Sequence, residues 1–169
     1  MDDRIADSEI VARILRPDWF DEGKLMHVAF ALRNGETYLS VNRYSIDTYE
    51  DDVKSFVSNH PAYAFGDDFQ GYCCAELHVG EVRDIHVALD EKQVDIDVDV
   101  EPRSAHVKSH AGIFTRYENA NLKPGTSLEI VKGMPNVAAD VVLLKVRMQL
   151  MKLSHCQQTR FSLPAAQHE

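Results

Sequence analysis

The strictest alternation of apolar and charged positions runs from residue 94 to residue 101. In this stretch valine or isoleucine alternates with a carboxylate at every second position: Val94, Asp95, Ile96, Asp97, Val98, Asp99, Val100, Glu101. Successive side chains of a β-strand point to opposite faces of the sheet, so one face of this strand is apolar and the other is acidic. The pattern predicts a half-buried antiparallel strand whose carboxylates face water.

Other apolar runs extend the predicted sheet. Residues 9–17 are rich in β-branched side chains, and residues 25–44 place two apolar runs on either side of Asn34-Gly35. Because Asn-Gly favours the positive φ angles of a type I′ turn, 25–44 is expected to be a β-hairpin. Two more strands are predicted at 71–80 and 81–89, followed by a turn near 90–91.

Helical spacing occurs in two places. In 47–60, Asp47 is a candidate N-cap, Glu50 stands three residues later, and Pro61 follows the segment. In 136–156, residues that favour helices are preceded by Pro135 and by a candidate cap at Asn136, although part of this segment would also tolerate a strand. Both segments are predicted to be helices.

The second of these helices carries two apolar stripes on roughly opposite sides. One consists of Val137, Val141, Leu144, Met148 and Met151, and the other of Ala139, Leu143, Val146, Leu150 and Leu153. A helix that packs on one sheet needs a single apolar stripe. The first stripe is therefore a candidate interface, covered either by the rest of the chain or by a second subunit.

These elements predict an α+β fold. We expect one domain over residues 1–156, with a largely antiparallel sheet of about six strands and both helices on one face. Residues 157–169 are polar and contain a proline, which predicts a C-terminal tail.

The composition is that of a globular protein. Of the 169 residues, 44% are hydrophobic and 27% are charged, and no apolar run reaches the ~18 residues that a membrane span requires. The first residues, MDDRIADSEIV, lack the pattern of a secretory signal, and three cysteines make an unpromising disulfide framework. A cytoplasmic protein is expected.

The charge disfavours one class of partner. The net charge is −9, and the chain has no cluster of lysine and arginine. Because nucleic-acid affinity depends largely on basic residues that neutralise phosphates, we expect no nucleic-acid partner.

The acidic strand and the histidines after it are a candidate metal site. The acidic stretch lacks the glycine that an EF-hand loop needs, and a strand holds its carboxylates in a row instead of wrapping an ion. His106 and His110 share a side in either a strand or a helix, and Asp99 or Glu101 could supply a carboxylate ligand. Such a site would suit a metal-dependent hydrolase.

A second candidate is a small anion-binding pocket. Arg43 lies in LSVNRY, and His110 and Arg116 lie in SHAGIFTRY, so the three could converge if the two strands were neighbours. A guanidinium binds carboxylate or phosphate through a planar fork. The alternative is that these residues form ordinary cross-strand contacts.

No short catalytic or nucleotide-binding motif is present, and no motif resembles that of a known family. The first expectation is therefore a non-catalytic module that binds a protein partner or forms a homodimer. The metal-dependent hydrolase and the anion binder are the alternatives. The sequence does not indicate whether a cofactor is bound.

Overall fold

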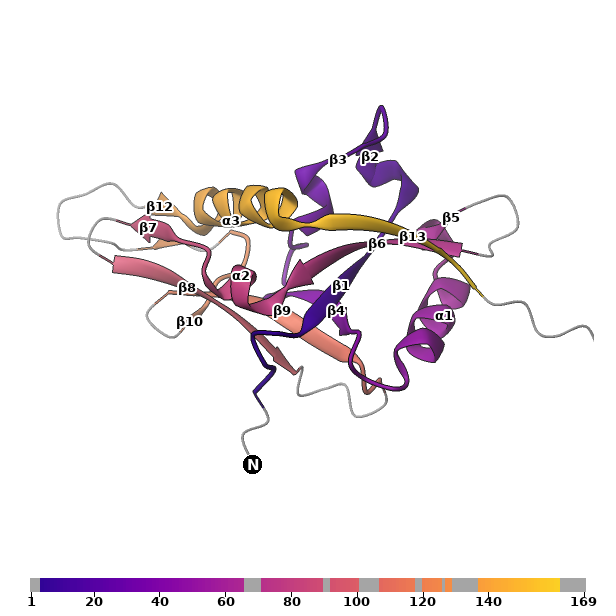
Figure 1. Cartoon of the computed structure of the whole chain (residues 1–169). Helices are drawn as coiled ribbons and strands as arrows, with labels where there is room; N and C mark the ends of the chain where they lie inside the picture. The colour runs from indigo at the N-terminus through magenta and orange to yellow at the C-terminus, as the bar shows by residue number, and fades with distance from the viewer. Residues whose placement is uncertain are drawn as a thin grey trace, which may run out of the picture.

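A computed structural model describes residues 4–65, 71–89, 92–100, 107–117, 120–125, 127–128 and 137–161. The fold is α+β and is built on one antiparallel sheet (Figure 1), which confirms the predicted fold class. Seven strands follow one another across the sheet: β13 (His155–Arg160), β6 (Gly71–His78), β1 (Ile10–Leu15), β4 (Tyr38–Arg43), β9 (His110–Tyr117), β8 (Lys92–Val100) and β7 (Val87–Leu89).

Shorter elements complete the described part of the chain. Strand β10 (Ala120–Asn121) pairs with β9 and β5 (Ala64–Phe65) pairs with β6, while β2 (Phe20–Asp21) with β3 (Lys24–Leu25) and β11 (Ser127–Leu128) with β12 (Val137–Ala138) form two small separate sheets. The helices are α1 (Tyr49–Asn59), α2 (Val79–Arg83) and α3 (Ala139–Leu153), and three 3₁₀ turns span Pro17–Trp19, His27–Phe30 and Pro61–Tyr63.

The central strands bury apolar side chains on both faces of the sheet. On one face, Val11, Leu15, Cys73, Ala75 and Leu77 belong to the core that α3 covers with Val142, Val146 and Leu150. On the other face, Ala12, Ile14, Tyr72 and Cys74 belong to the core that α1 covers with Tyr49, Val53 and Val57. The two helices therefore lie on opposite faces (Figure 1), and the expectation that they share one face is wrong.

Strand β8 has the predicted alternation. Val94, Ile96 and Val98 are buried, whereas Asp95, Asp97 and Asp99 lie on the other face and are exposed or half-buried. Its register with β9 aligns Asp99 with Gly112, so the acidic face of β8 continues onto the α1 side of β9.

The predicted hairpin at 25–44 is not formed. Its first arm is the 3₁₀ turn His27–Phe30, and β4 pairs instead with β1 and β9. The positive φ lies at Gly35 and not at Asn34, which is incompatible with a type I′ turn. That geometry is found between β2 and β3, where Glu22 and Gly23 both have positive φ.

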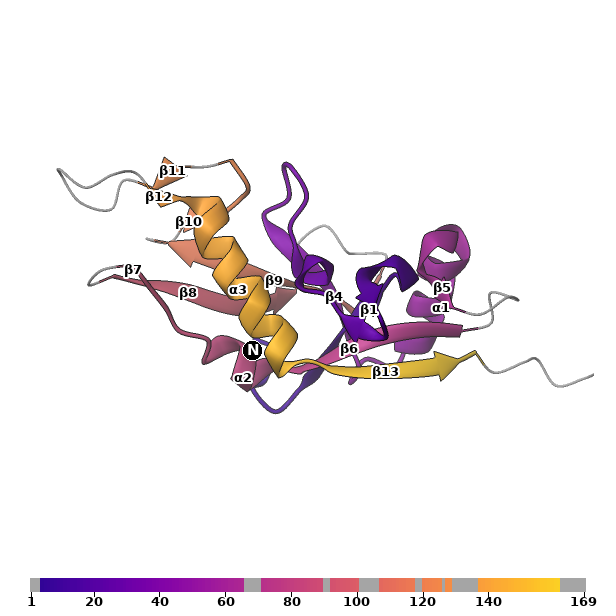
Figure 2. The same cartoon turned by 90° about the horizontal axis from the view of Figure 1, so that it is seen from above.

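Two further segments differ from expectation. Residues 81–89 were expected to be one strand, but α2 continues to Arg83 and only Val87–Leu89 is extended. After α3, residues 157–160 of the expected tail belong to β13, which pairs with β6 along the edge of the sheet as far as Arg160 (Figure 2). The expected turn at 90–91 lies outside the described residues.

None of the helices in the described part of the chain is long and apolar enough to span a membrane.

In Figure 2, α3 crosses the sheet obliquely and continues directly into β13. The core that it covers is the larger of the two clusters.

The orientation of α3 gives a first prediction. Leu150 is 2% exposed whereas Met148 is 39% exposed, so Leu150→Ala removes packed side-chain volume and Met148→Ala removes mostly hydrated volume. We expect Leu150→Ala to lower the free energy of unfolding by about 2–5 kcal/mol and Met148→Ala to change it by less than about 1 kcal/mol. Urea denaturation of both variants measures this, and equal losses would contradict the orientation of the helix.

Candidate functional site

A pocket of about 420 Å³ lies on the α1 side of the sheet, lined by residues of α1, β1, β4 and β9. The helix contributes Asp52, Ser55, Phe56 and Asn59. These positions are three or four residues apart, so they share one side of α1, next to the side that packs on the core. Strand residues lining the pocket are Arg13, Ile14, Ser40, Asn42 and His110, and Tyr63 and Val107 complete it.

The strands reach the pocket because of their alternation. On β4, Leu39 and Val41 are buried in the core beneath α3, so Ser40 and Asn42 point to the α1 side. The register pairs Asn42 with His110 on β9, which places His110 on the same side.

Arg13 occupies a position where two strands separate. The pairing of β1 with β4 covers Val11 and Ala12, and Arg13 is the first β1 residue beyond it and lines the pocket. Its Nη1 donates to the Ser40 carbonyl (3.0 Å) and its Nε donates to the Ala29 carbonyl (3.2 Å). The guanidinium carbon also lies 5.3 Å from the centre of the Trp19 ring, within cation–π distance.

The charge of Arg13 has no carboxylate at ion-pair distance among the described residues. Burial lowers the pKa of Arg13 to about 10, so the guanidinium is still a cation at neutral pH. A guanidinium has five N–H donors, and the two carbonyl contacts use two of them. Arg13 therefore offers positive charge to the pocket, together with N–H groups that donate to no described residue.

Asp52 supplies a negative charge to the same pocket. Its Oδ2 accepts hydrogen bonds from the backbone N–H of Ser109 (3.0 Å) and from the Thr48 hydroxyl (2.9 Å). Ser109 is fully buried, and its hydroxyl accepts a hydrogen bond from the Asn42 amide. Burial raises the pKa of Asp52, but the hydrogen bonds from Ser109 and Thr48 outweigh burial and lower it overall, so Asp52 is ionised at neutral pH.

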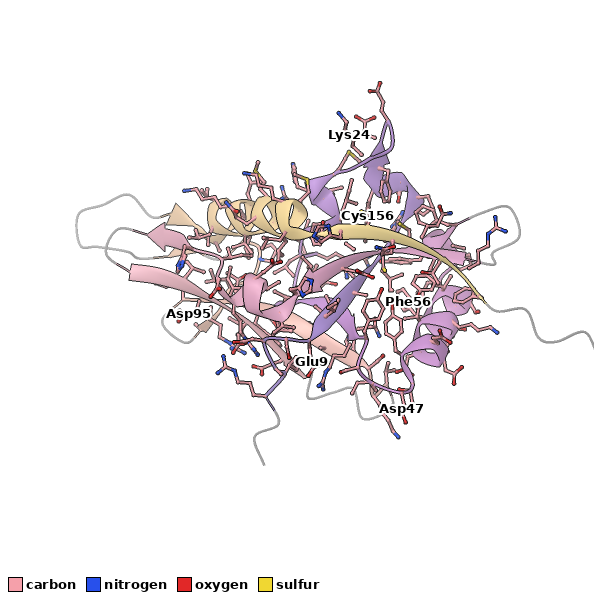
Figure 3. All side chains as sticks on the ribbon, in the orientation of Figure 1. Glu9, Lys24, Asp47, Phe56, Asp95 and Cys156 are labelled. Atoms are coloured by element: carbon pink, nitrogen blue, oxygen red, sulfur yellow. The ribbon has the colours of Figure 1, made fainter. Side chains whose placement is uncertain are left out.

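Aromatic rings border the pocket near α1. Phe56 stacks on His60 with ring centres 4.5 Å apart and meets Tyr63 edge-on at 4.9 Å, and Tyr63 in turn meets Trp19 edge-on at 5.7 Å. Figure 3 places Phe56 on α1, at the opposite end of the sheet from Asp95 on β8. The pocket therefore combines two opposite charges and neutral polar groups with an aromatic and aliphatic border.

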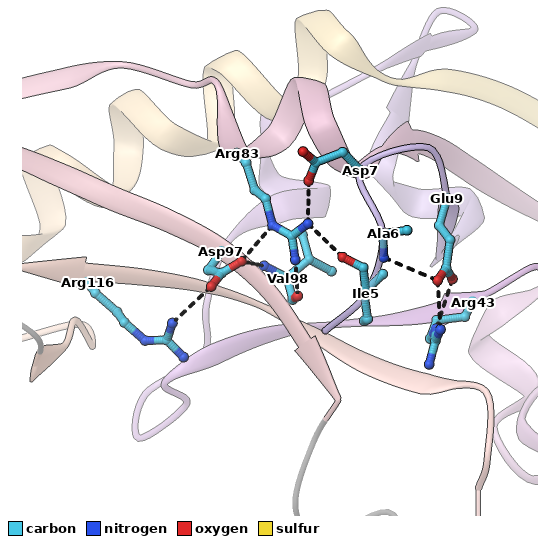
Figure 4. A network of polar contacts seen from close by, with 9 residues as sticks. All are labelled: Ile5, Ala6, Asp7, Glu9, Arg43, Arg83, Asp97, Val98 and Arg116. Atoms are coloured by element: carbon cyan, nitrogen blue, oxygen red, sulfur yellow. Dashed lines mark hydrogen bonds and ion pairs between the residues drawn. The ribbon is translucent and has the colours of Figure 1, made fainter. Parts of the chain in front are cut away.

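Of the three residues expected to bind an anion, only His110 lines this pocket. Arg43 donates twice to the carboxylate of Glu9, through Nε (3.0 Å) and Nη2 (2.8 Å). Arg116 lies 3.3 Å from Asp99 and 3.6 Å from Asp97, and it also donates to Asn121. Figure 4 shows Arg43 beside Glu9 and Arg116 beside Asp97.

Sequence reasoning did not identify Arg13. One signal was present, because Arg13 is the only charged residue in the apolar run IVARIL of β1. A charge inside a central strand needs a specific environment, which makes such a residue a candidate for function.

The expected metal ligands are only partly described. His106 and Glu101 lie outside the described residues. Asp99 and His110 are on the same face of adjacent strands, but Asp99 accepts a hydrogen bond from Arg116. Within the described ranges, no group of three or more histidine, cysteine, aspartate or glutamate residues is placed to hold a metal ion. The metal site stays a prediction.

The acidic face of β8 is held by arginines. Arg83 of α2 donates through Nε to Asp97 (2.7 Å), and its other nitrogens donate to Asp7 and to the carbonyls of Ile5 (2.7 Å) and Val98 (3.0 Å) (Figure 4). This network joins the N-terminal segment, α2 and β8. Of the described carboxylates on this face, Asp95 is exposed as expected, whereas Asp97 and Asp99 are half-buried and paired with arginines.

The candidate interface on α3 faces outward. Val141, Leu144 and Met148 are 48%, 38% and 39% exposed, and Met151 is half-buried against the core. The side chain of Val137 lies outside the described part of the chain. The exposed three form a continuous stripe at helical spacing.

Comparison with protein-family models, with curated proteins and with solved structures finds no match to this chain.

The arginine network gives a prediction about pH. Burial raises the pKa of Asp97, but its hydrogen bonds with Arg83 and Val98 lower it further, to below the ordinary value. The carboxylate therefore adds stability above the pKa of the unfolded state, about 4, and this contribution disappears as pH falls through the lower pKa of the folded state. We expect Asp97→Asn to lower the free energy of unfolding by about 1–2 kcal/mol near neutral pH, with the loss shrinking on acidification.

Urea denaturation over a pH series measures this difference. Asp95→Asn, on the same strand face, is the control and should have little effect at any pH. A loss in Asp97→Asn that is the same at all pH values would contradict the ion-pair origin of the stability.

Proposed function

We propose that this protein binds a small anionic molecule in the pocket beneath α1. The observation that carries the proposal is the Arg13 guanidinium, which lines the pocket as a cation with no carboxylate partner among the described residues. A partly desolvated charge without a counter-ion gains when an anion binds beside it. The fork of a guanidinium suits a carboxylate or a phosphate group.

The other groups of the pocket support a ligand of small-molecule size. A volume of about 420 Å³ lies in the range of small-molecule sites, which combine an apolar lining with a few polar groups that set orientation. Ser40, Asn42 and His110 surround the pocket beside Arg13, whereas Ile14 and Val107 offer apolar contact. The proposed ligand therefore has an anionic group and an apolar body.

We propose a reducing, cytoplasmic setting for this binding. All three cysteines are free, and Cys73 and Cys74 are buried on opposite faces of β6. Burial raises the pKa of Cys73 to about 12 and that of Cys74 to about 11, so both are protonated near neutral pH. Buried thiols of this kind act as small apolar side chains.

Removal of the Arg13 charge tests the binding proposal. Thermal unfolding is measured with acetate, benzoate, 3-phenylpropanoate and inorganic phosphate. A ligand that binds the folded state alone adds about 2.7 kcal/mol at a hundred times its dissociation constant, which raises the melting temperature by several degrees. We expect 3-phenylpropanoate to stabilise the wild type and Arg13→Gln to lose this effect.

Arg16→Gln is the matched control. Arg16 also lies over the Trp19 ring, at 5.8 Å, but it pairs with Asp18 and does not line the pocket. It should keep the full stabilisation by ligand. An equal response in wild type and Arg13→Gln would refute the proposal, as would the failure of every carboxylate and phosphate ligand tested on this protein.

The exposed stripe of α3 favours a second function, self-association. Val141, Leu144 and Met148 present apolar surface on one side of the helix, and methionine adapts well to a partner surface. We propose a homodimer that covers this stripe. A two-fold axis would pack the stripe of one copy against the same stripe of a second copy, so that both apolar surfaces are removed from water.

A charge in the stripe tests this second proposal. Met148→Glu would place a carboxylate in the buried interface and should shift the protein from dimer to monomer. Gln149→Glu adds the same charge at the neighbouring exposed position and should leave the dimer intact. Sedimentation equilibrium over a concentration series measures the mass, and a wild type that is monomeric throughout would refute the proposal.

A further inference from the structure

From the charges of the pocket beneath α1 we infer that its ligand is a zwitterion, a free amino acid with a large apolar side chain. This inference rests on the proposed binding function and names its ligand class. Arg13 and Asp52 line the same pocket with opposite charges, yet no ion pair joins them. A ligand with both charges can satisfy both residues at once.

The Arg13 side of the pocket fits the carboxylate of an amino acid. The contacts from Nη1 to the Ser40 carbonyl and from Nε to the Ala29 carbonyl hold the guanidinium in place. Among the described residues, Nη2 and the second N–H of Nη1 have no acceptor, and these donors can bind a carboxylate. Because the guanidinium is already held, little side-chain entropy is lost when the ligand binds.

The Asp52 side fits the ammonium group. Asp52 Oδ2 accepts hydrogen bonds from the Ser109 backbone N–H and from the Thr48 hydroxyl, and the Ser109 hydroxyl also interacts with the carboxylate. A carboxylate has about four lone-pair sites, so these donors fix the position of Asp52 and leave it room to accept from one more donor. An ammonium group donates up to three hydrogen bonds and accepts none, so it complements this carboxylate.

Ligands with one charge fit less well. An anion beside Arg13 also meets the negative charge of Asp52, and a cation beside Asp52 meets the positive charge of Arg13. In a partly desolvated pocket, each unpaired charge costs free energy. A zwitterion pairs both charges and leaves the pocket with no net change in charge.

The apolar border selects the side chain. Ile14, Phe56 and Val107 line the pocket, and Tyr63 adds a second aromatic ring packed on Phe56. A volume of about 420 Å³ leaves room for a side chain as large as leucine or phenylalanine beyond the two charged groups.

Two matched sets of ligands test the inference on the wild-type protein by isothermal titration calorimetry. One set is L-phenylalanine, 3-phenylpropanoate, which lacks the ammonium, and 2-phenylethylamine, which lacks the carboxylate. The other is L-leucine, 4-methylpentanoate and 3-methylbutylamine. We expect at least one amino acid to bind roughly tenfold or more tightly than either of its single-charge analogues.

The outcomes separate this inference from the proposed function. If 3-phenylpropanoate or 4-methylpentanoate binds as tightly as its amino acid, the anion-binding function stands and the zwitterion inference is wrong. If no carboxylate in either set binds, both are wrong. The comparison uses only wild-type protein, so it does not depend on how any variant folds.

Asp52→Asn assigns the ammonium contact. Asparagine keeps an oxygen that can accept from Ser109 but removes the charge, so the preference for the amino acid over its deaminated analogue should fall to about twofold or less while carboxylate binding persists. Asp51→Asn, at the exposed neighbouring position of α1, is the control and should keep the full preference. An unchanged preference in Asp52→Asn would refute the assigned contact.

Discussion

The strands at the centre of the sheet bury apolar side chains on both faces, and the rest of the structure depends on this constraint. On β6, Cys73 and Ala75 belong to one core while Tyr72 and Cys74 belong to the other. Such a strand is stable only when both faces are covered, so one helix on each side is required. The pocket lies on the α1 side, where polar residues of β4 and β9 replace this apolar surface.

The arginines of the protein differ in whether a carboxylate neutralises them. Arginines at the β8 and β9 end of the sheet are matched with carboxylates, as Arg83 is with Asp97. Arg13 differs because its hydrogen-bond partners in the described residues are backbone carbonyls, which satisfy donors without neutralising the charge. Arginines that are paired with carboxylates hold segments of the chain together. A guanidinium in a pocket that has no carboxylate partner among the described residues can instead form a favourable charge interaction with a bound anion.

Periodic patterns in the sequence were sufficient to predict the elements that follow one regular spacing of apolar residues. The alternation in β8 and the helical spacing in α1 and α3 are local patterns, and all three elements were predicted. The prediction of a hairpin at 25–44 was wrong because Asn34-Gly35 favours a turn but does not determine which strands pair. Strand β4 pairs with β1 and β9 instead. Arg43 and Arg116 were chosen by residue type, but only the fold reveals that Glu9 and Asp97 already pair with them.

Asp52 links the pocket to the framework of the protein. Through Ser109 it connects α1 to the start of β9, and Ser109 connects in turn to Asn42 of β4, another residue of the pocket. A ligand held between Arg13 and Asp52 would therefore add a bridge from β1 to α1 alongside this existing one. Helix α1 contributes few buried side chains to its core, so such a bridge would strengthen the attachment of α1 to the sheet. Ligand binding and the docking of α1 on the sheet would then be thermodynamically coupled.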